Sequence, residues 1–86
     1  DDHVEAWEFE VSTDSSVGDT LVHELSDSGW PNEALIASII RGENVLMPDG
    51  SSKIEVGDHL LVVATRSCFK KVEEMFKRKT GFWGFL

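Results

Sequence analysis

The chain has 86 residues, 41% of them hydrophobic, and a net charge of −8. A chain of this length forms one domain and buries only about 60–65% of the surface that its unfolded form exposes. We therefore expect no deep pocket within one copy, but a modest surface site or a site completed by a second copy. The acidic charge disfavours nucleic acid as a partner, because nucleic-acid binding needs basic patches for phosphate contacts.

The first part of the sequence predicts a strand and a short helix. In residues 3–12, HVEAWEFEVS, apolar and polar side chains alternate, which is typical of a half-buried strand. In residues 20–26, TLVHELS, the apolar residues share one side of a helix, and Asp19 stands where it can cap the first turn. Gly29 and Pro31 then end the helix.

Residues 34–48, ALIASIIRGENVLMP, predict a β-hairpin. Two apolar runs rich in Val, Ile and Leu flank a bend at Gly42, and Pro48 ends the second strand. Alternate residues of a strand share a face. We therefore expect one face to carry Leu35, Ala37, Ile39 and Arg41, and the opposite face to carry Ile36, Ser38 and Ile40.

Two more elements and a tail follow. Residues 59–65, HLLVVAT, predict a strand, and the unbroken apolar run at its centre indicates cover on both faces. Residues 68–79 predict an amphipathic helix, because apolar residues recur at intervals of three and four. The aromatic tail, residues 80–86, packs on the domain, contacts a partner or is the edge of a longer chain, and these alternatives stay open. The order predicts an α+β fold, βαβββα, with a mixed or antiparallel sheet and two helices.

Patterns of catalysis and metal binding are absent from the sequence. Cys68 is the single cysteine and has no second catalytic element beside it, and the three histidines lack the spacing of metal ligands. We therefore expect no enzyme activity, no cofactor and no metal site. His59 next to Asp58 is a candidate proton sensor, since an imidazole beside a carboxylate changes its charge near neutral pH.

Several short patterns resemble a known family in their order and spacing. They are a helix start with Gly18, Thr20, Leu21, Glu24 and Leu25, a strand that closes on Ile39, Arg41 and Gly42, a strand that ends at Pro48, and the turn Gly57-Asp58 before an apolar strand and a closing helix. Over about residues 9–76 this set resembles the TrkA-C domain, also called the RCK C-terminal domain, of bacterial potassium and cation transport systems. The variant PNEALIASIIRG is most similar to the copies attached to monovalent cation/proton antiporters.

The resemblance implies a regulatory domain at the cytoplasmic face of the membrane, attached to the transmembrane antiporter domain of the same chain. Residues 1–86 are then a single TrkA-C-like domain and a fragment of a larger membrane transport protein. The resemblance also implies a two-fold homodimer that senses a small ligand, cyclic di-AMP or another nucleotide, at the dimer interface. The residues expected to bind this ligand are Leu35, Ala37, Ile39, Arg41, Asn44, Val45 and Pro48. Arg41 would donate to a phosphate and Asn44 would read a base edge.

Two alternatives stay open at this point. Arg41 and Asn44 are also consistent with a purely structural role, in which their polar side chains only solvate the turn of the hairpin. The domain also suits a dimerisation module without a ligand, which holds two copies of a transporter or channel together.

Overall fold

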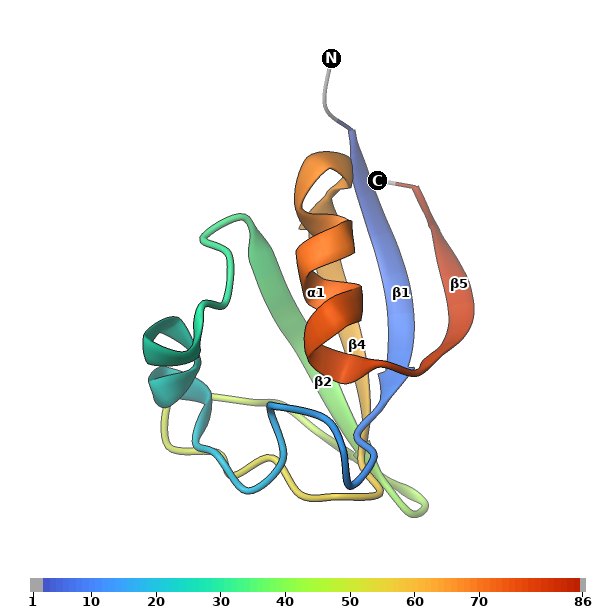
Figure 1. Cartoon of the computed structure of the whole chain (residues 1–86). Coiled ribbons are helices and arrows are strands. Elements are labelled where there is room, and N and C mark those ends of the chain that lie inside the picture. The colour runs from blue at the N-terminus through green and yellow to red at the C-terminus, as the bar shows by residue number, and fades with distance from the viewer. Residues whose placement is uncertain (1–2, 86) are drawn as a thin grey trace.

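The structure, a computed structural model, describes residues 3–85 and confirms the α+β fold. Neighbouring strands are all antiparallel, and their order in the sheet is β3-β2-β4-β1-β5 (Figure 1). The strands are β1 (Val4–Glu10), β2 (Ala34–Arg41), β3 (Asn44–Leu46), β4 (His59–Thr65) and β5 (Lys79–Phe85). The helices are α1 (Phe69–Phe76) and the short 3₁₀ helices η1 (Val22–Ser28) and η2 (Arg66–Cys68).

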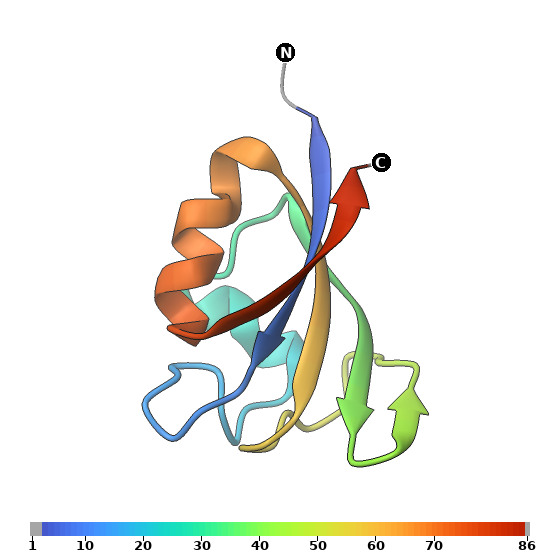
Figure 2. The same ribbon diagram turned by 90° about the vertical axis from the view of Figure 1, so that its right-hand side faces the viewer.

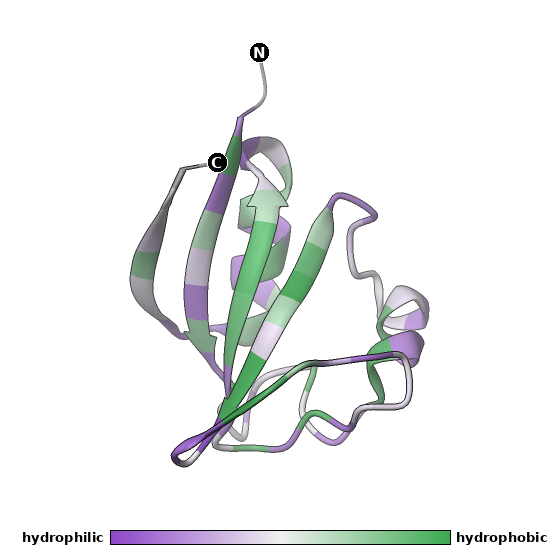
Figure 3. Cartoon of the chain, turned by 180° about the vertical axis from the view of Figure 1, so that it is seen from behind, coloured by the Kyte–Doolittle hydropathy of each residue, from purple (hydrophilic) through white to green (hydrophobic). Residues whose placement is uncertain are grey.

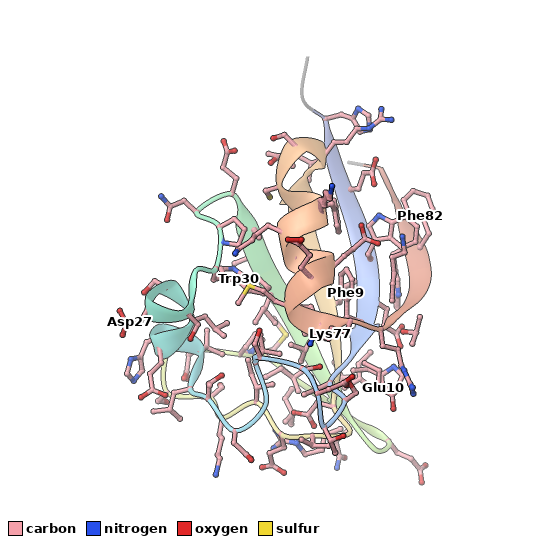
Figure 4. The ribbon with its side chains drawn as sticks, viewed as in Figure 1. Phe9, Glu10, Asp27, Trp30, Lys77 and Phe82 are labelled. Carbon is pink, nitrogen blue, oxygen red and sulfur yellow. The ribbon has the colours of Figure 1, made fainter. Side chains whose placement is uncertain are left out.

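The helices cover one face of the sheet. α1 and η1 lie on the same side, and the other side carries no helix within residues 3–85 (Figure 2). The core fills the space between helices and sheet, where Phe9 of β1 is fully buried and stacks on Phe76 of α1 at 4.7 Å between ring centroids. Trp30 meets Phe76 edge-on at 5.9 Å and closes the core between η1 and α1 (Figure 4).

Both predicted helices are present, with different ends. α1 stops at Phe76 because Lys77 adopts the left-handed conformation, with φ at 66°, and its N–H donates to the carbonyl of Glu73 at 2.7 Å. The helix expected over residues 20–26 is the 3₁₀ helix η1, which begins after Leu21. The prediction that Asp19 caps it is wrong, because the Glu24 carboxylate accepts from the Leu21 N–H at 3.0 Å instead.

The prediction that the strand over residues 59–65 is covered on both faces is wrong. Leu60, Val62 and Ala64 are buried under the helices, whereas Leu61 and Val63 are only half-buried on the opposite side. The unbroken apolar run of β4 therefore leaves an apolar surface without cover in the described chain.

The tail packs on the domain as the edge strand β5, which pairs with β1. Phe82 lies on Trp7 at 4.7 Å between ring centroids, and the Lys79 ammonium group lies 4.1 Å from the centre of the Trp7 ring. Of the predicted tail, only Leu86 lies outside the described residues.

The alternation predicted for residues 35–41 is wrong, because β2 contains a bulge. The register of β2 against β4 shifts between Ile36 and Ser38. An extra residue in one strand reverses which face the following side chains occupy. As a result, Ile36 and Ile39 are both buried in the core, whereas Leu35 is 64% exposed on the other side.

The bulge predicts unequal costs for two matched truncations. Ile39→Ala should lower the free energy of unfolding by about 2–5 kcal/mol, because it leaves a cavity in the core. Leu35→Ala removes the same number of carbon atoms from an exposed site and should cost less than about 1 kcal/mol. Urea unfolding of both variants, at a concentration low enough to keep the protein monomeric, measures the difference. Equal losses would contradict the bulge.

Candidate functional site

The β2–β3 hairpin is the first part of the candidate site. Arg41 pairs with Asn44, so Gly42 and Glu43 alone form the loop. Gly42 has φ at 60°, in the left-handed region that two-residue hairpin loops require and glycine tolerates. Asn44 and Val45 follow on the exposed side of the bend, and Val45 is 66% exposed. The end of the hairpin therefore presents side chains to solvent or to a partner.

Arg41 is held by the loop before β4. Its Nε and Nη2 atoms each donate to the Asp58 carboxylate at 2.8 Å, which is the forked pairing that guanidinium favours. Nη2 also donates to the Lys53 carbonyl at 2.8 Å, and Nη1 lies 3.3 Å from Glu55 Oε2. The guanidinium that the sequence assigns to a phosphate is therefore engaged by groups of its own chain.

Asp58 is a buried charge with a full set of partners. Its side chain is 2% exposed and also accepts the N–H of Glu55 at 2.9 Å. Burial raises the pKa of Asp58, but the hydrogen bonds from Arg41 and the Glu55 amide outweigh burial and hold the pKa below its ordinary value. The Asp58 hydrogen bond in turn raises the pKa of Arg41. The pair, which we call the clamp, is therefore charged on both sides at neutral pH and ties the hairpin to the loop before β4.

A groove of about 410 Å³ lies between η1, the start of β2 and the loop after β3. Trp30 forms part of its wall, and its Nε1 donates to the Ala34 carbonyl at 2.8 Å, which fixes the indole ring. The wall also includes Val22, Leu25, Leu35, Pro48 and Gly50. The groove is therefore a modest surface site within one copy, with a largely apolar wall, a fixed aromatic ring and the polar side chains of His23, Ser26 and Asp49 in its lining.

Five of the predicted site residues lie on accessible parts of the structure. Leu35 and Pro48 line the groove. Asn44 and Val45 are exposed near the end of the hairpin, and Ala37 is half-buried at the bulge. Leu35 and the end of the hairpin lie six residues, about 20 Å, apart along β2, whereas Pro48 follows Asn44 by four residues, which span at most about 14 Å.

The other two predicted residues have partners inside the domain. Ile39 is fully buried in the core, and Arg41 belongs to the clamp. Sequence reasoning missed Trp30 and Leu25 as groove residues. The signal was present in the tryptophan that follows the helix-ending Gly29, because an aromatic residue at such a break commonly packs back onto the helix.

The uncovered side of the sheet forms an apolar surface, which we call the open face. Cross-strand pairing places on it Leu35 opposite Val63, Ser38 opposite Leu61 and Ile40 opposite Val45. Figure 3 views this side and shows apolar residues along β2 and β4. A contiguous apolar patch of this kind marks an interaction surface.

Metal and membrane features are absent from residues 3–85. No group of three or more His, Cys, Asp or Glu side chains is placed there to hold a metal ion. No helix in the same residues has the length and apolar content to cross a membrane. The Cys68 thiol is half-buried and lies 3.4 Å from the Thr65 carbonyl oxygen, to which it donates a hydrogen bond.

Comparison with known proteins gives one family. The TrkA-C domain matches residues 8–77. A Trk system potassium uptake protein TrkA homolog of Archaeoglobus fulgidus is 42% identical over 53 residues, which are 62% of this chain and 12% of that protein. The K(+)/H(+) antiporter NhaP2 of Shewanella baltica is 28% identical over 75 residues, with 74% of this chain and 13% of the antiporter covered. The chain therefore spans only a small part of the length of these relatives.

Solved structures share the fold. The RCK_C domain dimer of S. agalactiae BusR in complex with c-di-AMP has a TM-score of 0.71 and 26% identity, covering 85% of this chain and 96% of that one. A second structure, of an RCK domain with cda, has a TM-score of 0.63 and 16% identity, covering 83% and 97% of the two chains. The second likeness concerns the fold alone.

The clamp predicts a stability difference that depends on pH. Asp58→Asn should lower the free energy of unfolding by about 1–3 kcal/mol at pH 7, because it removes the charge that Arg41 pairs with while Arg41 stays partly in water. A carboxyl whose pKa is lowered on folding stabilises the protein above its unfolded pKa and stops doing so as the pH falls through its folded pKa. The difference should therefore be constant from about pH 5 to 8 and shrink below about pH 4.

Urea unfolding at several pH values measures this difference. Glu55→Gln serves as the control, because Glu55 meets the same guanidinium from an exposed position and should change stability by less than about 1 kcal/mol. A difference between Asp58→Asn and the unsubstituted protein that persists undiminished at pH 3 would contradict the charged clamp.

Proposed function

Because this chain belongs to the TrkA-C domain family, a family of regulatory domains, we propose that it regulates a monovalent cation/proton antiporter as a ligand-sensing homodimer. The transmembrane antiporter domain is part of the same, longer chain, and residues 1–86 form one domain at the cytoplasmic face of the membrane. The ligand is a nucleotide, with cyclic di-AMP as the first candidate.

Two relatives support a transport protein as the host. One is described as a potassium uptake protein and the other as a K(+)/H(+) antiporter, and in each the match covers a segment of domain size. A match of that size, 12% and 13% of the two relatives, is consistent with one domain of a longer protein.

The observation that carries the dimer proposal is the open face. Leu35 of β2 and Val45 of β3 are 64% and 66% exposed, and half-buried Leu61 and Val63 lie on the same face of β4, the neighbour of β2 on its other side. A stable interface buries about 800 Å² on each partner, which is a moderate share of the total accessible surface of 5080 Å². A two-fold interface uses the same patch on both copies, and the BusR structure of the same fold is a dimer.

The ligand site lies where the open face meets the groove. Leu35 belongs to both surfaces, and Pro48 and Trp30 offer an apolar wall for a purine ring. Asn44 stands about 20 Å from Leu35 along β2, so one nucleotide does not readily contact both of these side chains in the same copy. In a two-fold dimer the hairpin of one copy reaches the groove of the other, so one ligand contacts both groups of predicted residues.

Such a ligand regulates the transporter only by preferring one arrangement of the two copies. A preference of ten- to a hundredfold corresponds to about 1.4–2.8 kcal/mol of coupling free energy. A nucleotide that bridges two copies has this preference, because it contacts both groups at once in one arrangement and one group in the other.

A second candidate function, a dimerisation module without a ligand, is favoured by the clamp. The Arg41 guanidinium is paired with Asp58, and the chain carries a net charge of −8, so a free phosphate meets little positive charge near the hairpin. Under this alternative the open face alone holds two copies together.

The dimer proposal predicts an effect of charge on the open face. Val45→Asp should weaken the dimer at least about tenfold, because association then buries a carboxylate without a partner. Val56→Asp is the matched control, since Val56 is 48% exposed in the loop before β4, and its dimer should match that of the unsubstituted protein. Sedimentation over a range of concentrations measures both. A monomer at all concentrations, or equal weakening by both variants, would contradict the proposal.

The ligand proposal predicts a heat of binding that depends on Asn44. Calorimetry with cyclic di-AMP and ATP should show binding of at least one nucleotide, and Asn44→Ala should weaken it about tenfold through loss of one hydrogen bond. Glu43→Ala is the matched control in the same loop and should bind as tightly or more tightly, because it removes a negative charge near an anion. An absence of heat with every nucleotide, together with an intact dimer, would support the ligand-free module.

A further inference from the structure

Glu8 of β1 uses both oxygens of its carboxylate to connect three strands. Its Oε1 accepts from the indole Nε1 of Trp83 in β5 at 3.1 Å. Its Oε2 lies 2.5 Å from Nδ1 of His59 in β4. The side chains of Glu8 and His59 are 22% and 34% exposed, so water reaches the pair only in part. One carboxylate therefore links a histidine in the sheet to the last strand of the described chain.

Three elements face His59, and two of them, β1 and the loop before β4, present charged groups to it. On β1, Glu10 lies directly across from His59 and pairs with Arg78 at 3.0 Å. In the loop before β4, both carboxylate oxygens of Asp58 accept hydrogen bonds from Arg41 in the clamp rather than from the His59 imidazole. On β2 the residue opposite is the apolar Ile40. The proton-sensing partner expected from the sequence was Asp58, whereas the structure gives this contact to Glu8.

We propose that the Glu8 carboxylate, which we call the clasp, holds β5 on β1 while His59 is protonated and holds it less tightly when His59 loses its proton. An imidazole is the side chain whose charge changes between about pH 5 and 8. When His59 is protonated, a charged N–H donates to Oε2 and fixes the carboxylate where Oε1 receives the Trp83 indole. When His59 is neutral, the bond loses its ionic part, and in one tautomer Nδ1 turns a lone pair toward the carboxylate. Proton loss therefore loosens β5.

β5 depends on such a contact because its pairing with β1 is irregular. The register shifts between Ala6 and Trp7 and again between Glu8 and Phe9, so the backbone ladder breaks on both sides of Glu8. β5 is also an edge strand, and it lies beyond residues 8–77, the part of the chain that the family matches. Its remaining side-chain contact with Glu8 is the bond from Thr80 Oγ1 to the Glu8 carbonyl at 3.2 Å.

Hydrogen exchange followed by NMR tests the clasp directly. The 86-residue chain is labelled with ¹⁵N, and the protection factors of the β5 amides are measured from pH 5.5 to 8 together with the indole N–H signal of Trp83. Trp83→Phe identifies that signal. We expect β5 protection to fall about three- to tenfold from the low to the high end of this range, the effect of one partly exposed charge-assisted hydrogen bond. Protection in β2 and β4 should stay constant, and the indole signal should shift with the same midpoint.

Two variants assign the effect to its residues. His59→Gln keeps a hydrogen-bond donor without binding a proton and should make β5 protection independent of pH. Glu8→Gln keeps an acceptor for the indole without the charge and should do the same, which preserves the test if His59→Gln does not fold. His23→Gln, on η1, is the control and should retain the pH dependence.

Three results would overturn the clasp: constant β5 protection in the unsubstituted protein, protection that rises with pH, or unchanged pH dependence in His59→Gln. The signals of α1 in the same spectra report whether each variant is folded. The clasp does not rest on the proposed function, so its failure leaves the dimer and the nucleotide site as they stand, and their failure leaves the clasp.

Discussion

Cover on one side of the sheet is the constraint on which the structure depends. α1 has eight residues, and with two short 3₁₀ helices it supplies a layer for only one face of a five-stranded sheet. β4, in the middle of that sheet, carries apolar side chains on both faces. Within residues 3–85 the second face therefore stays without a layer, and an uncovered apolar face of this kind marks an interaction surface. The small size of the domain, rather than a particular motif, is the reason that we propose a second copy as the partner of this face.

Arg41 has a structural role in the clamp and is also the residue that we expect to meet a phosphate. The clamp uses Nε and Nη2 for Asp58 and Lys53, yet 36% of the side chain remains accessible. A guanidinium has five N–H donors, so a phosphate has only to share Arg41 with Asp58. Such sharing gives a weaker attraction than a free arginine offers, because the Asp58 charge already compensates most of the positive charge. A nucleotide at the proposed interface would therefore gain much of its affinity from apolar and stacking contacts in the groove.

The order of the first six elements along the chain, the hairpin and the closing helix followed from local patterns in the sequence, because hydrophobic periodicity and turn residues act over a few positions. The bulge at Ala37 did not follow from such a pattern, because the sequence ALIASII is equally compatible with a regular strand and with a bulged one. Only the packing of both Ile36 and Ile39 into the core decides the register. The clamp likewise joins residues 17 positions apart. β5 escaped prediction because Gly81 and Gly84 weaken its strand pattern, and its place on β1 comes from contacts of Phe82 and Trp83 with residues early in the chain.

The open face borders both sites at which we propose that a signal acts, the clasp for the proton and the groove for the nucleotide. On one side it borders the groove through Leu35, and on the other Glu8 of the clasp lies directly across from Leu61. Leu61 in turn lies across from Ser38 on β2, so one row of cross-strand neighbours connects the clasp to the strand that bounds the groove. Proton and nucleotide each act on a dimer only through the arrangement that they favour. In the proposed dimer both sites would border the same contact surface, so a change in how the two copies pack would alter both, and by linkage proton binding and nucleotide binding would each alter the other.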